Sequence, residues 1–540
     1  MQYPTPDKGR AETYRQKGYW RDQVIGDLFA SSVAKYPTDL AVRDASGAKL
    51  TYRELDERSA CVAGYLVAQG IGKGDIVTVC LPNWCDTVVV FMGIIRAGGV
   101  VNPVPVAYGT ADLAFAIKKC ESRALFLPER FRSRDFLAVL DDLRPNIGPD
   151  CSVVVLGDAP VSGATLWGQV LAHDPLAQPI EIKADDPLTV LFTSGTESRP
   201  KGAVHTHNTV MFGENALATT LGLGANDVAF MASPISHTTG FMHGVILTLT
   251  TGGTLSLLDV FNGDVAAAQM AAHRCTWTMG ATPFLADTAA ALEATGNSLP
   301  DLRYFLCGGA PIPEVLARRA TDVGFRVMSV YGATEAPPHT VVFPSDLIEN
   351  AWNSDGRPLP GIEVRIIDEN GDDLPTGEVG EELSRGPNAF LGYLGEPELT
   401  RRDLKEDGWY HSGDLARMLP DGSLRVVGRK KEIIVRGGQN ISVREVEDYL
   451  MAHPAVERAA VVGIPHERLG ETGCAVLVLR AGQTLSLPEI VAFLKGKGVA
   501  MFKLPERLEI WPELPMNPSG KIQKFIIRNR IDEHSVEDKK

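Results

Sequence analysis

Hydrophobic positions in the first part of the chain alternate between two periodicities. Between Leu50 and Val106, a segment with helical spacing (residues 51–70) precedes a short β-rich run (residues 75–83) and a further apolar segment. The same alternation recurs around four more apolar runs, at residues 151–158, 188–195, 252–259 and 302–310. Helix and strand in turn, with Gly and Asn at the joints, predict an α/β fold of layered subdomains with substantially parallel sheets.

Two later segments depart from this alternation. Residues 361–383 contain short strands broken by Asn-Gly and Thr-Gly turns, which predicts a small β hairpin or barrel unit. Further on, Ser442 and Glu445 have capping-box spacing, and they are followed by expected strands at residues 458–464 and 473–479 and an expected helix near residues 487–498. We therefore expect a large N-terminal domain (residues 1–430) and a small, mobile α+β domain (residues 431–540).

Length and charge narrow the class of protein. At 540 residues the chain exceeds the ~100–200 residues of a typical domain, so a multidomain globular enzyme is expected. Its 53 basic and 67 acidic residues give a formal net charge of −14. That balance argues against nucleic acid and membrane surfaces as partners, because both need a basic face. It does not exclude small anionic ligands, which need only a few local donors.

The cysteines and the apolar runs predict a cytoplasmic protein. The eight cysteines are scattered without a CxxC pair, which is typical of reduced thiols. The first twenty residues have no apolar core behind their charges, unlike a secretory signal. The longest apolar run, about Val88 to Ile95, is far shorter than the ~20 residues that span a bilayer.

The segment TSGTESRPKG, from Thr193 to Gly202, directly follows an apolar run. Small hydroxylated residues and glycines allow backbone N–H groups and hydroxyls to surround phosphate oxygens, while Lys201 adds a compact positive charge. A Walker-type loop is excluded, because Lys201 stands between Pro200 and Gly202. An ordinary Gly/Ser loop remains the alternative. The nearby His205–Thr206–His207 lacks partners at metal-ligand spacing, and we interpret it as part of a polar loop.

Four further motifs favour the phosphate-binding interpretation: YGATE (residues 331–335), WYHSGD (residues 409–414), GRKKEIIVRGG (residues 428–438) and NPSGK (residues 517–521). In this order the chain resembles the superfamily of adenylate-forming enzymes, which includes acyl-CoA synthetases, carrier-loading adenylation domains and firefly-type luciferases. The resemblance runs from about Val24 to Ile527 and is nearest to cyclohexanecarboxylate-CoA ligases and medium-chain acyl-CoA synthetases. Each motif alone could be an ordinary turn, cap or surface charge, whereas five motifs in order favour a site.

The resemblance implies a role for each matching residue. Lys521, Glu335 and His237 are the expected catalytic residues, with Lys521 bridging the substrate carboxylate and the α-phosphate. Glu335 and Thr193 would hold Mg²⁺, Lys431 would be the hinge, and Gly437 and Gly438 would line a pantetheine tunnel. The expected ATP-binding residues are Thr193, Ser194, Gly195, Thr196, Lys201, Gly309, Ala310, Pro311, Tyr331, Gly332, Thr334, Asp414 and Arg429.

The residue types suit the chemistry of adenylation. A carboxylate that attacks an α-phosphate brings two anions together, so a divalent cation and a well-placed ammonium are needed to neutralise charge. Glu335 supplies a hard oxygen ligand, and Asp414 can accept from both ribose hydroxyls. Lys521 lies in a Pro/Gly/Ser loop, which suits a residue that one half-reaction alone requires.

The phosphate loop departs from the pattern of the superfamily at two positions. It usually reads TSGTTGxPKG, whereas Glu197 and Ser198 stand here in place of Thr and Gly. Because a carboxylate facing phosphates is unfavourable, we expect Glu197 to point out of the cradle or to cap a neighbouring amide.

The resemblance also locates an acyl pocket, formed by His237, Thr238, Phe241, Thr282, Cys307, Gly308 and Ala333. These residues are small or apolar apart from His237, which favours a compact apolar carboxylic acid: alicyclic, simple aromatic, or short- to medium-chain. Thr238 occupies the position at which dihydroxybenzoate- and salicylate-activating relatives carry Asn. This difference disfavours an ortho-hydroxyaryl acid.

We therefore expect an AMP-forming acid:CoA ligase that uses ATP, Mg²⁺ and CoA. A stand-alone adenylating enzyme that loads carrier-protein pantetheine is the alternative, and the sequence does not separate the two acceptors. A luciferase-like monooxygenase has no positive support. A non-catalytic nucleotide-binding relative is disfavoured, because Lys521, Glu335, Asp414 and Arg429 are retained. Monomer and homodimer both remain open.

Overall fold

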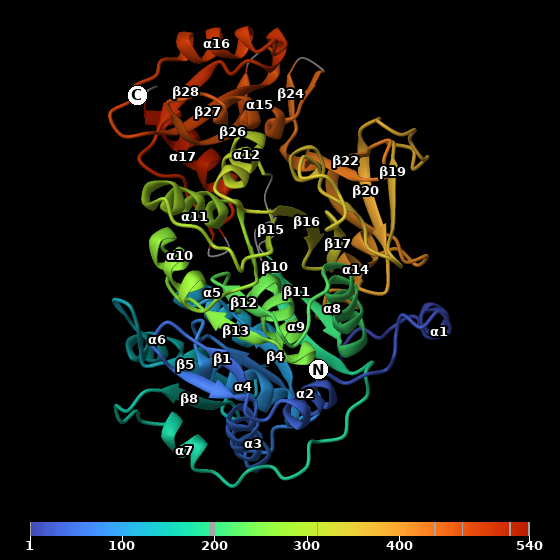
Figure 1. Cartoon of the computed structure of the whole chain (residues 1–540), viewed down its shortest axis with the longest axis vertical. Coiled ribbons are helices and arrows are strands. Elements are labelled where there is room, and N and C mark those ends of the chain that lie inside the picture. Colours follow the sequence, from blue (N-terminus) through green and yellow to red (C-terminus); the bar gives the residue numbers. More distant parts are fainter. Residues whose placement is uncertain are drawn as a thin grey trace.

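The computed structural model describes residues 2–193, 200–309, 312–436, 439–466, 468–517 and 520–537. The N-terminal part of the chain forms two large sheets with helices and a smaller third sheet, and the C-terminal part forms a separate unit at one end of the molecule (Figure 1). The predicted α/β fold, with a large N-terminal domain and a smaller C-terminal one, is confirmed.

The first sheet contains eight of the described strands, in the order β21-β11-β10-β4-β3-β5-β8-β9. It is parallel from β10 to β9, and β10 and β11 form an antiparallel hairpin at one side. Its strands are β3 (Ile76–Val79), β4 (Val100–Pro103), β5 (Ala124–Pro128), β8 (Ser152–Leu156), β9 (Thr165–Leu166), β10 (Pro187–Thr193), β11 (Lys201–Thr206) and β21 (Gly392–Tyr393). A short pair, β6 (Arg130–Phe131) and β7 (Arg134–Asp135), lies apart from it.

The second sheet contains nine described strands, in the order β18-β17-β16-β15-β14-β12-β13-β1-β2. It is parallel from β16 to β1, and beyond this run β17 and β18 pair antiparallel on one side and β2 pairs antiparallel on the other. Its strands are β1 (Leu40–Arg43), β2 (Lys49–Thr51), β12 (Val228–Met231), β13 (Thr254–Leu257), β14 (Trp277–Gly280), β15 (Tyr304–Gly308), β16 (Val327–Ala333), β17 (Ala336–Val341) and β18 (Arg357–Pro358).

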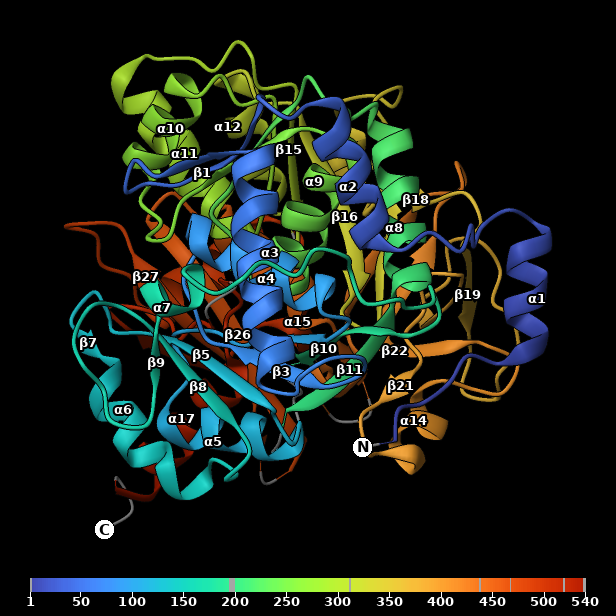
Figure 2. The ribbon, with the colours of Figure 1, turned by 90° about the horizontal axis from the view of Figure 1, so that it is seen from below.

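Apolar helices fill the space between these two sheets. One continuous buried cluster joins side chains of both sheets to those of α3, α4 and α8, and Figure 2 shows α3 and α4 between the two sets of strands. The helices of this half are α1 (Lys8–Gln16), α2 (Ile25–Lys35), α3 (Tyr52–Ala68), α4 (Cys85–Arg96), α5 (Thr110–Lys119), α6 (Phe136–Leu143), α7 (Trp167–Leu171), α8 (His207–Leu221), α9 (Leu247–Thr251), α10 (Gly263–Ala272), α11 (Thr282–Thr295), α12 (Glu314–Asp322) and α13 (Asn350–Asn353), with 3₁₀ turn η1 (Arg144–Asn146) and π-helix η2 (Thr239–Ile246).

The third sheet is antiparallel and carries residues that the motifs single out. Its described strands are β19 (Glu363–Ile367), β20 (Gly380–Arg385), β22 (Tyr410–Met418) and β23 (Leu424–Arg429), in the order β19-β20-β22-β23, with α14 (Pro397–Asp403) beside it. The register pairs Asp414 of β22 with Arg429 of β23. Two segments that are separate in the sequence therefore present their side chains together.

The C-terminal unit begins after the 3₁₀ turn η3 (Lys430–Glu432), which contains the expected hinge Lys431. Its sheet and helices are β24 (Ile434–Arg436), β25 (Gln439–Ile441), β26 (Val456–His466), β27 (Gly470–Leu479), β28 (Arg507–Ile510), α15 (Val443–Met451), α16 (Leu487–Gly496), η4 (Met501–Lys503) and α17 (Lys524–Glu537). Ser442 caps α15 by accepting from the backbone N–H of Glu445, as the sequence predicts. The boundary at residues 430/431 stays a prediction.

Most elements expected from the hydrophobic pattern are confirmed. The helix expected at residues 51–70 is α3, and the expected C-terminal strands and helix are β26, β27 and α16. The interpretation of residues 205–207 as a polar loop is wrong, because His205 and Thr206 complete β11, His207 begins α8, and all three are buried. All eight cysteines are free thiols, and no described helix combines the length and apolarity needed to cross a bilayer.

Gly356 lies where the backbones of the second and third sheets approach each other closely. Its carbonyl accepts from Leu424 N of β23, its φ is +88°, and a Cβ there would lie 2.2 Å from the backbone carbon of Val341 in β17. We predict that Gly356→Ala lowers the free energy of unfolding by more than about 3 kcal/mol, because a backbone clash adds to the cost of positive φ. Chemical denaturation measures this.

Gly371→Ala is the matched control for that experiment. Gly371 has a similar φ of +90° but no atom near its added Cβ, so only the backbone cost of about 1 kcal/mol applies. Equal losses in the two variants would contradict the clash at Gly356.

Candidate functional site

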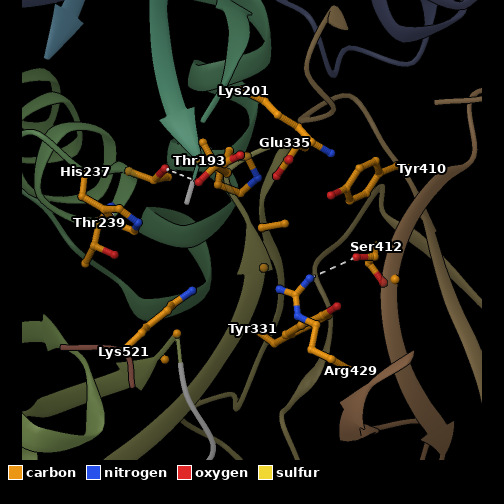
Figure 3. A pocket seen from close by; sticks show the side chains of 18 of the residues that line it. Thr193, Lys201, His237, Thr239, Tyr331, Glu335, Tyr410, Ser412, Arg429 and Lys521 are labelled. Carbon is orange, nitrogen blue, oxygen red and sulfur yellow. Dashed lines mark hydrogen bonds between the residues drawn. The ribbon is translucent and has the colours of Figure 1, made fainter. Parts of the chain in front are cut away.

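A cavity of about 610 Å³ lies where the ends of β10, β11, β16 and β22 meet η2, β23 and the C-terminal segment (Figure 3). Most of the predicted site residues line it: Thr193, Lys201, His237, Thr238, Gly308, Gly309, Tyr331, Gly332, Ala333, Thr334, Glu335, Arg429, Lys431 and Lys521. Four of the five motifs are represented in this list, and Tyr410 of the fifth, WYHSGD, also lines the cavity. An adjoining cavity of about 570 Å³, between α11, α12 and α15, is lined by the remaining candidates Thr282 and Asp414.

Two predicted acyl-pocket residues lie behind the cavity wall. Phe241 is fully buried and packs edge-on against Phe91 of α4, with ring centroids 5.1 Å apart. Cys307 is also fully buried, with its thiol 3.9 Å from the Thr282 hydroxyl. Several predicted residues fall outside the described residues: Ser194, Gly195, Thr196, Glu197, Ser198, Ala310, Pro311, Gly437 and Gly438.

The hairpin of β10 and β11 holds both ends of the expected phosphate loop. Thr193 and Lys201 are directly opposite in its register. The Lys201 ammonium lies 3.4 Å from Asp403 Oδ2 and 5.1 Å from the ring centre of Tyr393. This positive charge is therefore held at the cavity by one carboxylate and one aromatic face.

Glu335 lies in a two-residue turn between β16 and β17, which also contains Thr334. The Tyr393 hydroxyl is 2.7 Å from Glu335 Oε1 and 3.1 Å from Asp403 Oδ2. His205 holds this turn in place, because its Nε2 donates to the Thr334 carbonyl at 2.7 Å. Burial lowers the pKa of His205 to about 4, so this ring acts as a neutral support.

Tyr331, Asp414 and Arg429 form a second hydrogen-bonded group. The Tyr331 hydroxyl donates to Asp414 Oδ2 at 2.7 Å, and Arg429 Nε lies 2.7 Å from Asp414 Oδ1. Burial raises the pKa of Asp414, and Arg429 acts in the opposite direction. The Asp414 carboxylate raises the pKa of Arg429, so the guanidinium keeps its charge.

Glu382 lies next to the group formed by Tyr331, Asp414 and Arg429 and is fully buried. Desolvation raises the pKa of Glu382 to about 8, and burial lowers the pKa of neighbouring His339 to about 3. Although Glu382 Oε1 is 3.7 Å from His339 Nδ1, the pair is uncharged at neutral pH. Glu382 can therefore share a hydrogen bond with the Tyr331 hydroxyl, 3.2 Å away, without adding negative charge beside Asp414.

Lys521 enters the cavity from the C-terminal segment. Gly309, at a φ of +79°, makes room for it, because a Cβ there would lie 3.1 Å from Lys521 Cε. Removal from bulk water, reinforced by Arg429, lowers the pKa of Lys521, while Asp414 and Glu335 oppose that effect. Among the described residues no carboxylate lies within 4 Å of its ammonium. A substrate carboxylate would supply that missing partner.

His237 lies on the Lys521 side of the cavity (Figure 3). Burial, followed by the charge of Lys521, lowers the pKa of His237 to about 3, so the ring is neutral. The backbone N–H of Thr239 points at His237 Nδ1 from 3.4 Å, which places the ring proton on Nε2. The cavity therefore has an uncharged N–H donor beside an ammonium.

Several polar residues of this cavity were not among the site residues predicted from the sequence. Tyr393 and Asp403 come from β21 and α14, Tyr410 opens β22, and His243 lies within η2. Of these, only Tyr410 is part of a recognised motif, WYHSGD.

The donors at the phosphate end of the cavity fit Mg²⁺. The Thr193 hydroxyl and the Glu335 carboxylate are hard oxygen ligands of the kind that this cation prefers. Glu335 Oε1 already accepts from Tyr393, which leaves Oε2 for a cation. Two protein ligands suit Mg²⁺, which usually takes its other ligands from water and from substrate phosphates.

The chain matches two family models. Residues 29–394 match the AMP-binding enzyme model, and residues 445–521 match that of the AMP-binding enzyme C-terminal domain. The chain therefore belongs to the AMP-binding enzyme family. The resemblance to adenylate-forming enzymes is confirmed.

Two relatives align over almost the whole chain. A medium-chain fatty-acid–CoA ligase of Escherichia coli (strain K12) is 41% identical over 539 residues, which covers 99% of this chain and 95% of that protein. The human mitochondrial medium-chain acyl-CoA ligase ACSF2 is 30% identical over 548 residues, covering 96% of this chain and 89% of that protein.

Two solved structures of MatB from Rhodopseudomonas palustris are also similar. The ATP-bound structure superposes with a TM-score of 0.83 at 29% identity, and the apo structure with a TM-score of 0.72 at 30% identity. Both comparisons cover 94% of this chain and 98% of that chain. The arrangement of this chain is thus more similar to the ATP-bound structure.

The protonation of Glu382 has a measurable consequence for stability. Its pKa rises on folding from the ordinary 4.5 to about 8, so between these values the folded state holds a proton that the unfolded state has released. The contribution of Glu382 to stability is therefore fully present below the lower value and is lost as pH rises toward 8, by at most ~1.4 kcal/mol per pH unit.

Glu382→Gln is neutral at every pH and lacks this dependence. We predict that its free energy of unfolding, relative to wild type, increases steadily between pH 5 and pH 8 in urea titrations. A difference that does not change with pH would show that Glu382 is ionised in the folded protein.

Proposed function

We propose that the chain is an AMP-forming acid:CoA ligase, which activates a compact apolar carboxylic acid with ATP and transfers the acyl group to the thiol of CoA. The observation that carries the proposal is the meeting of Lys521 with Thr193, Lys201 and Glu335 in one cavity. Membership of the AMP-binding family and 41% identity to a fatty-acid–CoA ligase over 99% of the chain support it.

In the first half-reaction a carboxylate oxygen of the acid attacks the α-phosphorus of ATP. The new bond gives an acyl-adenylate, and pyrophosphate leaves with the electron pair of the broken bond. Lys521 would lie between the carboxylate and the α-phosphate and reduce their repulsion. Thr193 and Lys201, with the loop between them, would hold the β- and γ-phosphates, and Thr334 would donate to the α-phosphate.

The nucleoside would bind between the strand ends. Asp414 and Arg429 would bind the ribose hydroxyls, while Gly309, Ala310 and Pro311 would line the adenine site together with Tyr331. The hydrogen bonds of Asp414 to Tyr331 and Arg429 fix its carboxylate before the nucleotide arrives. Mg²⁺, held by Thr193 and Glu335, would supply charge neutralisation at the phosphates.

In the second half-reaction the CoA thiolate attacks the acyl carbonyl carbon, and AMP is the leaving group. The small C-terminal domain, with its boundary at residues 430/431, would rotate about Lys431 and withdraw Lys521. Gly437 and Gly438 would then allow the pantetheine arm to approach closely. No dedicated strong base is required, because the adenylate is already activated. A carrier-protein pantetheine is the alternative acceptor.

The acyl group would bind beside His237 and Thr238, against Gly308 and Ala333. These residues leave space for an alicyclic, simple aromatic or medium-chain acid. Cytoplasmic location, and the choice between monomer and homodimer, remain predictions from the sequence.

A panel of acids tests the proposed reaction. With ATP, Mg²⁺, free CoA and a compact apolar acid, the protein should form AMP, pyrophosphate and acyl-CoA in equal amounts, measured by chromatography. AMP formation without a thioester would favour the carrier-loading alternative. The absence of AMP with every acid would contradict adenylation.

Separate assays of the two half-reactions test the role of Lys521. Lys521→Ala should reduce adenylate formation at least ~10³-fold, because the ammonium neutralises two approaching anions. Thioester formation from supplied acyl-adenylate should stay within about threefold of wild type, since Lys521 is withdrawn in that step. Equal losses in both assays would refute domain alternation. Lys503→Ala, which removes a partly exposed lysine of the same domain paired with Glu445, is the control.

A further inference from the structure

Arg444 of α15 reaches from the C-terminal unit to the N-terminal domain and is buried at their junction. Its side chain is 7% exposed. The guanidinium donates from Nη1 to the Val426 carbonyl of β23, and the same nitrogen lies 3.5 Å from Asp355 Oδ2. Both partners precede the expected hinge Lys431 in the chain, whereas Arg444 follows it. A rotation of the C-terminal unit about that hinge would therefore break both contacts.

Two further described contacts cross the same junction, and both are weaker candidates for holding it together. The Ser442 hydroxyl donates to the Val427 carbonyl at 2.6 Å, which involves no charge. Arg458 lies 3.8 Å from Asp287, whose side chain is 47% exposed. Exposed ion pairs contribute little to stability, whereas a buried charge depends on its partner. Of these contacts, that of Arg444 has the greatest consequence when it is lost.

Both members of the Arg444–Asp355 pair have a second charged neighbour on their own side of the hinge. Asp355 Oδ2 also accepts from the backbone N–H of Val426 at 2.9 Å, and Arg425 of β23 lies 4.0 Å away. On α15, burial raises the pKa of Asp448, and the charge of Arg444, one turn away, opposes that rise. Separation of the pair would therefore leave neither charge without an opposite charge nearby. This property suits a contact that forms and breaks in each catalytic cycle.

The contact is also limited in strength. Nε and Nη2 of Arg444 have no hydrogen-bond partner among the described residues. Burial, followed by the charge of Arg444, lowers the pKa of Arg425, so two guanidinium groups repel each other across the junction. Donors without a partner and like charges both reduce the net gain from closing the junction. The pair is therefore suited to shift an equilibrium between two arrangements without fixing one of them.

We propose that Arg444 is a positioning residue that, through Asp355 and the Val426 carbonyl, favours the closed arrangement, in which Lys521 enters the cavity. The inference rests on the proposed function and on rotation about Lys431. Arg444 does not line the cavity that contains Lys521, so it acts through the position of the C-terminal unit. The greater similarity of this chain to the ATP-bound MatB structure than to the apo structure supports the assignment.

Two rate constants measure the balance between the arrangements. At subsaturating co-substrate, kcat/KM for ATP in adenylate formation is proportional to the fraction of free protein that is closed. The kcat/KM for supplied acyl-adenylate in thioester formation is proportional to the remaining fraction. The ratio of the first constant to the second therefore reports the equilibrium between the two arrangements, whichever of them is more populated.

Arg444→Met removes the guanidinium and keeps an unbranched side chain at the junction. We expect the ratio to fall about tenfold, because a hydrogen-bonded charge that favours the closed arrangement is lost. An unchanged ratio would overturn the proposal even if both constants fall, since a partly unfolded protein lowers both equally. If the wild type forms no AMP with any acid, the proposed function fails, and this inference fails with it.

Asp355→Asn tests whether the carboxylate is the partner of Arg444. Its amide oxygen can still accept from the Val426 N–H, so the N-terminal domain should keep its fold. The ratio should fall in this variant, and the double variant with Arg444→Met should fall no further than Arg444→Met alone. Losses that multiply in the double variant would overturn the pairing of the two residues.

Arg507→Met is the matched control. Arg507 belongs to the same C-terminal unit, and its guanidinium lies 2.7 Å from Glu509 in its own strand, β28. Because this pair lies within one unit, its loss should leave the ratio within about twofold of wild type. A tenfold fall in the control as well would mean that the ratio follows the loss of any arginine from the unit, which would overturn the assignment to Arg444.

Discussion

The ammonium of Lys521 is the charge on which the rest of the site depends. It stands in the cavity without a carboxylate within 4 Å among the described residues, and its pKa is lowered by removal from bulk water and by Arg429. A buried, unpaired cation is unfavourable until an anion arrives. The N-terminal domain makes space for it through Gly309, whose missing side chain is the gap that Lys521 fills. The C-terminal segment thus contributes a charge that the other domain accommodates but does not supply.

Two other cations of the cavity are held by carboxylates. Lys201 lies beside Asp403, and Arg429 is paired with Asp414. This arrangement reconciles a formal net charge of −14 with two polyanionic substrates, because net charge describes the whole surface and binding depends on a few fixed groups. Each paired cation is already oriented, so the approach of phosphates needs a change of partner and little rearrangement of the backbone.

The sequence predicts those site residues whose positions follow from regular structure. Thr193 and Lys201 lie at the facing ends of β10 and β11 in the first sheet, and Glu335 lies in the turn that follows β16 in the second sheet. In α/β folds ligands bind beyond the ends of the strands, so side chains at these positions are expected at a site. Tyr393 and Glu214 could not be predicted in this way. Each is a single polar residue in an ordinary strand or helix, and its partner comes from a distant part of the chain. Local periodicity and spacing carry no information about such contacts.

Because local sequence patterns do not report such distant contacts, the acyl pocket is more polar than the sequence predicts. The motif residues are mostly small or apolar, so they predict an apolar pocket, and two of them, Phe241 and Cys307, lie behind its wall. The structure instead brings two imidazoles to this side: His237, which is a neutral ring, and His243, which is hydrogen-bonded to Glu214. Lys521, which has no carboxylate within 4 Å among the described residues, is the ammonium available where the anions react. The remaining lining of the pocket is small or apolar and can admit an uncharged acyl group.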